Sequence, residues 1–341
     1  MDPKEVALLR LVAQGLVPGE RSPVDAVRHL LALQGQDLPG VLRSVALRST
    51  PGTTTDDVAA ALDDGRLVRT WPLRGTLHVV ATDDVRWLLA LTGEAQHARA
   101  RRRFDELGLD AAQAARALDV AREALAGDGL TRDALLAAWV AGGVPTDGQR
   151  GYHLLAHLAQ ARAVVWGATT RADDGRVTGQ RLRLLDEVAP PDDRTDDREA
   201  LLARLAERYL RSHGPASVLD LARWSGLGVR EVRSGVAQVR DGLERVEVDG
   251  VEQLMDPTTP ERLAALRDQA RGELRLPGFD ELVLGYADRS ATLAPEHATA
   301  VVPGGNGVFR PTVVREGRVV GTWRPGSRGR DPVVEPFSAR A

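Results

Sequence analysis

The chain of 341 residues contains no cysteine. This absence excludes disulfide bonds, cysteine-ligated zinc, iron–sulfur clusters and thiol nucleophiles. Long apolar runs are also missing, because no stretch approaches the roughly 18 residues that span a membrane. The first residues carry Asp2, Lys4 and Glu5, which do not suit a signal peptide. We therefore expect a cytoplasmic protein with no membrane partner.

Lysine is nearly absent as well, since Lys4 is the only one, and arginine supplies the other cations. The net charge is −3, but the charges are segregated. Residues 66–103 hold eight Arg and three acids, a net charge of +5, and residues 301–330 also reach +5. Residues 186–199 carry a net charge of −5. A GC-rich genome accounts for Arg in place of Lys, whereas the clustering favours a basic, phosphate-binding face.

One local pattern occurs three times: a group of helical segments followed by a two-stranded hairpin. Helices are predicted at 2–15, 22–36, 54–65, 110–127, 131–143, 147–161 and 198–214, and residues 217–239 are predicted as two helices joined by an "SGLG" turn. Hairpins are predicted at 66–81, 162–185 and 243–255, with turns at Arg74-Gly75, at 172–176 and at Asp249-Gly250. Three helices and a two-stranded wing make up a winged-helix unit. The sequence thus predicts an α+β fold of three tandem winged-helix units.

The predicted domain boundaries follow these repeats. Winged helix 1 takes residues 1–110, winged helix 2 takes 111–190 and winged helix 3 takes 195–275, with "APPDDRTDD" (189–197) as the linker. Residues 276–330 alternate β-rich runs with Gly and Pro, so we expect a small β-barrel-like element there. Residues 331–341 read as an irregular tail.

Four sequence blocks, taken in order, resemble those of a known family. They are "LLALQGQD", "LVRTWPLRGTLHVVATDD", "LPGFDELVLGYADRSATL" and "VVPGGNGVFRPTVVREGRVVGTW". Over residues 3–325 the chain resembles the AlkZ-like winged-helix DNA glycosylases. That resemblance implies winged-helix units around a C-terminal barrel-like part, a C-shaped DNA-binding channel, and a catalytic Gln-x-Gln or Gln-x-Asp motif.

The resemblance places Gln34 and Gln36 at the catalytic positions of the Gln-x-Gln branch. The chain departs from the pattern at Gly35, where an aliphatic residue is usual, and Asp37 directly follows as a possible supporting carboxylate. Side chains two residues apart on an α-helix point about 200° apart. The pair must therefore lie at or beyond a helix end, and Gly35 and Pro39 fit such an end. A merely structural alternative has Gln34 capping a helix.

Two amides suit a particular kind of N-glycosidic hydrolysis. A purine alkylated at N7 is cationic and leaves without further protonation, through a transition state that resembles an oxocarbenium ion. The enzyme then needs to orient a water toward C1′, and a glutamine amide can both accept and donate a hydrogen bond. No metal or cofactor is implied. An uncharged lesion such as uracil needs help that amides do not supply, so we expect it to remain uncleaved.

Other polar residues have both a functional and a structural interpretation. Seven arginines are expected to contact DNA phosphates: Arg69 and Arg74 on the first hairpin, then Arg101, Arg102, Arg103, Arg315 and Arg318. The alternative is that these side chains are only solvated surface charges. Asp280 and Glu281 are plausible active-site supports, with a structural role favoured. His153 and His157 have zinc-like spacing but lack the glutamate of His-Glu-x-x-His, so core or surface histidines are favoured.

The sequence therefore predicts a monomeric, nucleoid-associated, monofunctional DNA glycosylase. Its substrate would be double-stranded DNA carrying N7-alkylated purines, including purines in interstrand crosslinks, in repair or in self-resistance to an alkylating natural product. An open basic channel rather than a deep aromatic pocket is expected beside Gln34 and Gln36. The alternative function is a non-catalytic winged-helix regulator, which would read bases with the helix-turn-helix that carries Arg230 and Arg233.

Overall fold

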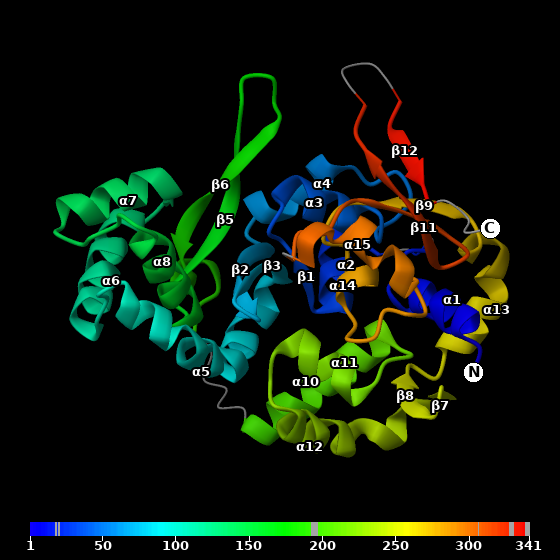
Figure 1. Ribbon diagram of the computed structural model, residues 1–341. Coiled ribbons are helices and arrows are strands. Elements are labelled where there is room, and N and C mark those ends of the chain that lie inside the picture. The colour runs from blue at the N-terminus through cyan, green and yellow to red at the C-terminus, as the bar shows by residue number, and fades with distance from the viewer. Residues whose placement is uncertain (18, 20, 192–196, 306, 327–330, 338–341) are drawn as a thin grey trace. The chain divides into compact units, whose positions relative to one another are not determined.

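The structure is a computed structural model that describes residues 1–17, 19, 21–191, 197–305, 307–326 and 331–337. Its chain divides into two compact units, shown together in Figure 1. Unit 1 combines residues 1–55 with residues 202–341, and unit 2 contains residues 56–201. Both units mix helices and strands, as expected. The predicted winged-helix boundaries divide the chain by its repeated sequence pattern rather than by compactness, and they stay a prediction.

Unit 1 joins two stretches of chain that are far apart in the sequence. Its N-terminal stretch contains α1 (Pro3–Ala13), α2 (Pro23–Leu30), β1 (Ala32–Gln34) and α3 (Leu38–Ala46). Its C-terminal stretch contains most of α10 (Arg198–His213), then α11 (Val218–Ser225), α12 (Val229–Val239), β7 (Glu244–Val248), β8 (Val251–Met255), α13 (Thr259–Ala270), β9 (Glu273–Leu276), α14 (Glu281–Leu284), α15 (Ala298–Val301), β10 (Thr312–Arg315), β11 (Arg318–Arg324) and β12 (Val333–Pro336).

Local sequence signals set the ends of the first two helices. The side chains of Asp2 and Ser22 cap α1 and α2, and each helix begins with a proline. α2 ends at Leu30, six residues earlier than predicted, because Leu31 takes a left-handed φ of 69°. The chain then forms β1. Pro39 lies in the first turn of α3, a helix that the sequence did not reveal.

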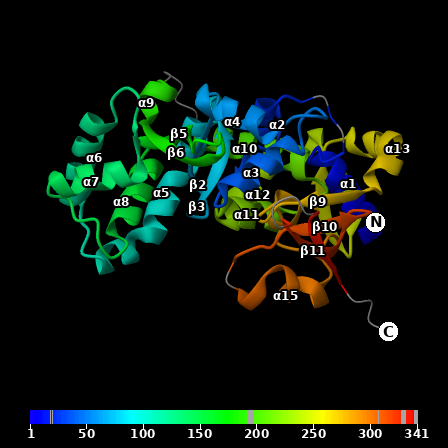
Figure 2. The same cartoon turned by 90° about the horizontal axis from the view of Figure 1, so that it is seen from above.

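Long-range contacts hold the two stretches of unit 1 together. α1 and α13 lie side by side in both Figure 1 and Figure 2, and the Arg267 guanidinium donates to both Glu5 carboxylate oxygens at 2.8 and 2.6 Å. Leucines and valines of α1 share a core with Leu263, Leu276 and Val314. The apolar face of α1 is thus covered by residues more than 240 positions away.

The C-terminal strands form an open sheet. Its order is β12-β11-β10-β9, with antiparallel neighbours, and the described strands do not close it into the expected barrel-like element. Residues 333–336 of the predicted irregular tail are its edge strand, because they pair with 321–324 of β11. Residues 327–330 and 338–341 lie outside the described residues.

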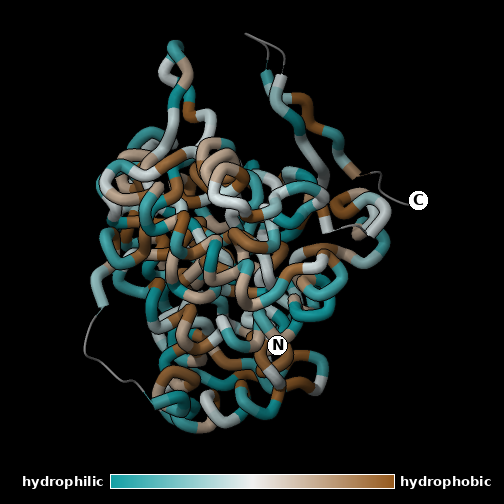
Figure 3. The backbone as a smooth tube through the Cα atoms, turned by 90° about the vertical axis from the view of Figure 1, so that its left-hand side faces the viewer, coloured by the Kyte–Doolittle hydropathy of each residue, from teal (hydrophilic) through white to brown (hydrophobic). Residues whose placement is uncertain are grey.

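Unit 2 contains the first two predicted hairpins. Its elements are most of α4 (Thr55–Asp63), β2 (Leu67–Leu73), β3 (Thr76–Ala81), α5 (Thr82–Glu106), α6 (Ala111–Leu125), β4 (Leu130–Thr131), α7 (Arg132–Ala141), α8 (Arg150–Gln160), β5 (Val164–Arg171), β6 (Val177–Leu184) and α9 (Leu185–Val188). The strands of this unit lie in the order β3-β2-β5-β6-β4, in which the two hairpins are joined through β2 and β5. In Figure 1, β5 and β6 extend beyond helices α6–α8, and Figure 3 shows the tip of this hairpin as hydrophilic.

The third hairpin, β7–β8, lies in unit 1 and turns at Asp249 and Gly250, both with positive φ, as the sequence predicts. All three predicted hairpins are therefore present. Most of the predicted 189–197 linker, residues 192–196, lies outside the described residues. Across the ranges that the structure describes, no helix is long and apolar enough to cross a membrane.

Close helix packing in unit 2 generates a stability prediction. α5 meets α8 at Gly93, where an added Cβ would lie 2.6 Å from the backbone oxygen of Gln160. Alanine ordinarily favours a helix by about 1 kcal/mol over glycine, but overpacking against backbone costs about 1–3 kcal/mol. We expect Gly93→Ala to lower the free energy of unfolding, measured by urea denaturation. The adjacent, exposed Glu94 provides the control, and Glu94→Ala should change stability by less than about 0.5 kcal/mol. Equal stability of the two variants would contradict the prediction.

Candidate functional site

The Gln-Gly-Gln segment is a strand end followed by a short loop. Gln34 is the last residue of β1, and its side chain is 8% exposed. Gln36 and Asp37 are exposed in the loop before α3. The pair therefore lies beyond a helix end, as expected, although the helix stops earlier. One amide is held inside the fold, while the other reaches solvent.

The backbone entering this segment is strained. Leu31 has φ 69° and ψ −49°, and it is fully buried. A leucine in this region costs free energy that surrounding packing must offset. The strain fixes an abrupt change of direction between α2 and β1, three residues before Gln34.

A buried carboxylate meets the end of β1. The Gln34 backbone N–H donates to Glu281 Oε1 at 3.0 Å, and Trp224 Nε1 donates to Glu281 Oε2 at 3.0 Å. His213 Nε2 lies 3.8 Å from the same Oε2. The side chains of Glu281 and His213 are fully buried. Burial lowers the pKa of His213, and the nearby Glu281 carboxylate offsets only part of this decrease.

A second buried carboxylate lies beside the first. Arg48 donates to both oxygens of Asp280 at 2.8 Å, and each of these side chains is 1% exposed. Ser44 also donates to Asp280, while Arg48 donates to Gln14 Oε1 at 2.9 Å. Asp280 thus has the structural role that the sequence favoured. Glu281, which the sequence analysis named as a possible active-site support, contacts the candidate catalytic segment directly, although through a backbone N–H that carries no sequence signal.

Asp37 takes the N-cap position of α3. A Cβ at Gly40 would lie 2.5 Å from Asp37 Oδ2, so the glycine leaves room for the carboxylate above the first helical turn. The Asp37 side chain is exposed and makes no capping hydrogen bond there, and its supporting role stays a prediction.

The predicted phosphate-binding arginines occupy different environments. In unit 2, Arg69 is half-buried over the Trp166 ring at 5.3 Å, Arg74 sits in the β2–β3 turn, and Arg101, Arg102 and Arg103 are exposed on α5. Arg102 and Arg103 hydrogen-bond to Glu106.

In unit 1, exposed Arg315 pairs with Glu273 at 2.8 Å and Arg318 is half-buried. The turn between them packs against α1, since a Cβ at Gly317 would lie 2.7 Å from the backbone of Ala7. This packing holds the turn against the first helix of its own unit.

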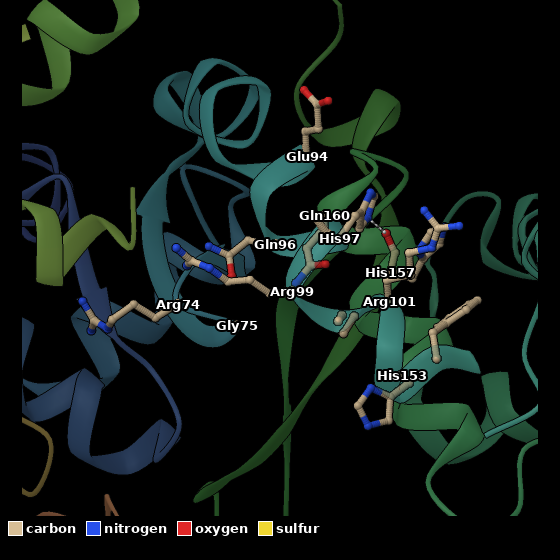
Figure 4. A pocket seen from close by; sticks show the side chains of 14 residues that line it. Arg74, Gly75, Glu94, Gln96, His97, Arg99, Arg101, His153, His157 and Gln160 are labelled. Atoms are coloured by element: carbon tan, nitrogen blue, oxygen red, sulfur yellow. Dashed lines mark hydrogen bonds between the residues drawn. The ribbon is translucent and has the colours of Figure 1, made fainter. Parts of the chain in front are cut away.

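Arg74 and Arg101 line a pocket of about 520 Å³ in unit 2. Figure 4 shows it between α5 and α8, with residues that include Gln96, His97, Arg99, His153, His157 and Gln160. The rings of His97 and His157 stack with centroids 4.3 Å apart, and Phe104 stacks on His157. His157 is therefore packed against two rings, which agrees with the structural role that the sequence analysis favoured over zinc binding. Among the described residues, no group of three His, Cys, Asp or Glu side chains is placed to hold a metal ion.

Comparison with known proteins gives the decisive observation about the chain's family. A sequence profile described as "DNA glycosylase AlkZ-like" matches residues 27–339. The chain belongs to this family. The enzyme class expected from the sequence, a DNA glycosylase and thus a hydrolase that acts on DNA, is confirmed. Catalysis is accordingly favoured over the non-catalytic regulator.

Individual relatives agree with this assignment. The chain is 26% identical over 352 aligned positions to the "Interstrand DNA cross-link repair glycosylase" of Streptomyces sahachiroi, and the alignment covers 98% of this chain and 90% of that protein. The solved structure of Streptomyces sahachiroi DNA glycosylase AlkZ matches with a TM-score of 0.81 and 25% identity, covering all of this chain and 92% of the other.

The pocket in this AlkZ-like protein generates a pH prediction. Burial, and then the nearby His97, lower the pKa of His157 to about 4, below the ordinary value near 6.5. Between these values the unfolded chain binds more protons than the folded one, so this group makes stability fall as pH falls through that range. We expect His157→Gln to reduce the loss of unfolding free energy between pH 7 and pH 4.5, measured by urea denaturation. An equal loss of unfolding free energy in the parent and in His157→Gln would show that the titration of His157 does not cause it.

Proposed function

We propose that this glycosylase hydrolyses the N-glycosidic bond of N7-alkylated purines in double-stranded DNA, including purines within interstrand crosslinks. The name of the Streptomyces relative supports the crosslink assignment. We also propose that it is monofunctional. A lyase step through a Schiff base needs a lysine amine or an equivalent amine, and the only lysine, Lys4, is exposed on α1.

We assign catalysis to Gln34 and Gln36. The observation that carries this proposal is their placement: Gln34 is held at a strand end by a buried carboxylate, and Gln36 is exposed two residues later. A fixed amide can hold a water in one direction, while an exposed amide can meet the DNA. Because an N7-alkylated base already carries a positive charge, orientation and electrostatics can supply the rate without a strong base. Asp37 is a candidate support for the developing charge on the sugar.

The proposal includes the mode of DNA binding. The candidate phosphate contacts are Arg69, Arg74, Arg101, Arg102, Arg103, Arg315 and Arg318. The helical segments that precede β2–β3, β5–β6 and β7–β8 support three winged-helix units, and a C-shaped DNA-binding channel belongs to the same proposal. We propose a monomer that acts on the nucleoid, in DNA repair or in self-resistance to a DNA-alkylating natural product.

Base excision provides the test of this function. We expect release of N7-methylguanine from duplex DNA and no release of uracil, which needs leaving-group activation that amides do not give. Gln34→Ala and Gln36→Ala should each lower single-turnover excision by about 10²–10³-fold, as the loss of one positioned transition-state hydrogen bond does elsewhere. The dissociation constant for DNA should change less than threefold, because phosphate contacts supply most affinity.

Abasic-site detection measures excision, and a fluorescence anisotropy titration measures binding. Asn cannot replace the longer side chain, so Gln34→Asn should also be slow. Unchanged excision in both alanine variants would remove Gln34 and Gln36 from the catalytic assignment. Efficient uracil excision would contradict the proposed substrate class.

Salt dependence tests the phosphate contacts. Each neutralised phosphate contributes about −0.9 to the slope of log affinity against log salt. We expect reversal of Arg101, Arg102 and Arg103 to Glu to make that slope shallower by roughly 1–3 and to weaken binding at low salt. Arg116, Arg122 and Arg132, exposed arginines of unit 2 outside both basic clusters, give a control with the same charge change. If both triple variants behave alike, the effect is one of net charge only.

A further inference from the structure

Glu281 is a fully buried carboxylate whose hydrogen-bond donors come from distant parts of unit 1. Removing a carboxylate from water is unfavourable unless N–H or O–H groups replace the lost water. Two N–H groups do so here, one on each oxygen: the backbone of Gln34 and the indole of Trp224, both at 3.0 Å. These donors lie 247 and 57 residues away from Glu281 in the sequence.

We propose that Glu281 is a positioning residue for excision: its carboxylate fixes the backbone of Gln34, so that the Gln34 amide is presented in one place. The proposal rests on the catalytic role of Gln34 proposed above. Hydrogen bonds to an ionised acceptor are roughly twice as strong as neutral ones. A misplacement of about 1 Å can cost about 10²-fold in rate. A firm anchor at this backbone position therefore bears directly on catalysis.

The neighbouring backbone explains why an anchor is needed. Leu31 is strained three residues before Gln34, and Gly35, which follows it, gives the chain a wide choice of conformations. β1 is only three residues long. The Glu281 carboxylate binds the chain between these two points, at the last residue before the exposed loop.

Glu281 is itself held from both sides. Gln14 Nε2 of α1 donates to the Glu281 backbone oxygen at 3.3 Å and to the Tyr286 hydroxyl at 3.0 Å. The preceding residue, Asp280, is fixed by Arg48. The anchor of the Gln34 backbone thus belongs to a buried polar network of unit 1.

The chemistry of the two donors makes Glu281→Gln a discriminating variant. The Gln34 backbone and Trp224 both donate to the carboxylate oxygens, and a primary amide has only one acceptor oxygen. Glutamine can satisfy either Trp224 or the Gln34 backbone, and its NH₂ must then face the other donor. We expect Glu281→Gln to lower the single-turnover excision rate of N7-methylguanine about 10–100-fold, with DNA affinity changed less than threefold.

Tyr209→Phe is the matched control. The buried Tyr209 hydroxyl donates to the Gly285 backbone oxygen at 2.6 Å, whereas the Gln34 backbone and Trp224 donate to the Glu281 carboxylate. We expect this variant to lower the melting temperature, as Glu281→Gln does, while keeping the excision rate within threefold of the parent. Rates that fall in step with melting temperature in both variants would overturn the proposal.

A second substitution tests the mechanism by rescue. Trp224→Phe removes the competing donor, so in Glu281→Gln/Trp224→Phe the amide oxygen is free to accept from the Gln34 N–H. We expect the double variant to excise at least fivefold faster than Glu281→Gln, despite a lower stability. A double variant that is slower than Glu281→Gln would contradict the positioning role, because mere loss of stability predicts that order.

Hydrogen exchange on the unaltered protein covers the case in which the variants do not fold. The backbone amide hydrogen of Gln34 should exchange far more slowly than that of Gln36 in the adjacent loop. Equal exchange rates would overturn the proposed anchor. This readout does not depend on activity. If Gln34→Ala leaves excision unchanged while the Gln34 amide is protected, the proposed catalytic role has failed but the anchor has not.

Discussion

Two adjacent buried carboxylates, Asp280 and Glu281, constrain how the segments in the interior of unit 1 are arranged. Burial removes the hydration of each carboxylate, so hydrogen-bond donors of the protein must replace the water with good geometry. Ser44 of α3 and Arg48, two residues beyond the end of that helix, donate to Asp280, while the β1 backbone and Trp224 of α11 donate to Glu281. Shifting any of these elements would leave a buried charge without its partner. The pair therefore selects one arrangement of segments that apolar contacts alone would fix less precisely.

This constraint connects stability with the proposed chemistry. The same carboxylate that keeps α11 and β1 together holds Gln34 at the start of the exposed loop. An arrangement of that kind suits a site that works by orientation, because the amides themselves supply no strong base. It also leaves Gln36 and Asp37 at the surface, where DNA can reach them.

Close packing of aromatic and apolar side chains forms the core of unit 2. Trp71, Trp139 and Trp166 share a core with leucines of α8, and Gly93 lets α5 approach α8 closely. The long helix α5 carries Arg101, Arg102 and Arg103 at its C-terminal end. These exposed arginines make the end of α5 locally basic, although the whole chain carries a net charge of −3.

Much of the fold was predictable because its signals are local. Capping residues and a following proline mark the starts of α1 and α2, and Asp249-Gly250 marks the β7–β8 turn. Family-specific blocks also pointed to the glycosylase family, which the profile match confirmed. The early end of α2, the short helix α3 and the open C-terminal sheet were missed. Each depends on what packs against the segment, not on its own residues.

The sequence by itself determined the helices of the repeated pattern, the three hairpins, the family and the candidate pair Gln34 and Gln36, but not α3, α5 or α13. Only the tertiary structure decided that Gln34 ends a strand and that Glu281, 247 residues away, accepts its backbone N–H. The physical reason is that a hydrogen bond to a buried carboxylate forms between whichever groups the fold brings together. A backbone N–H is present at nearly every residue, so no side-chain pattern announces which one will be used.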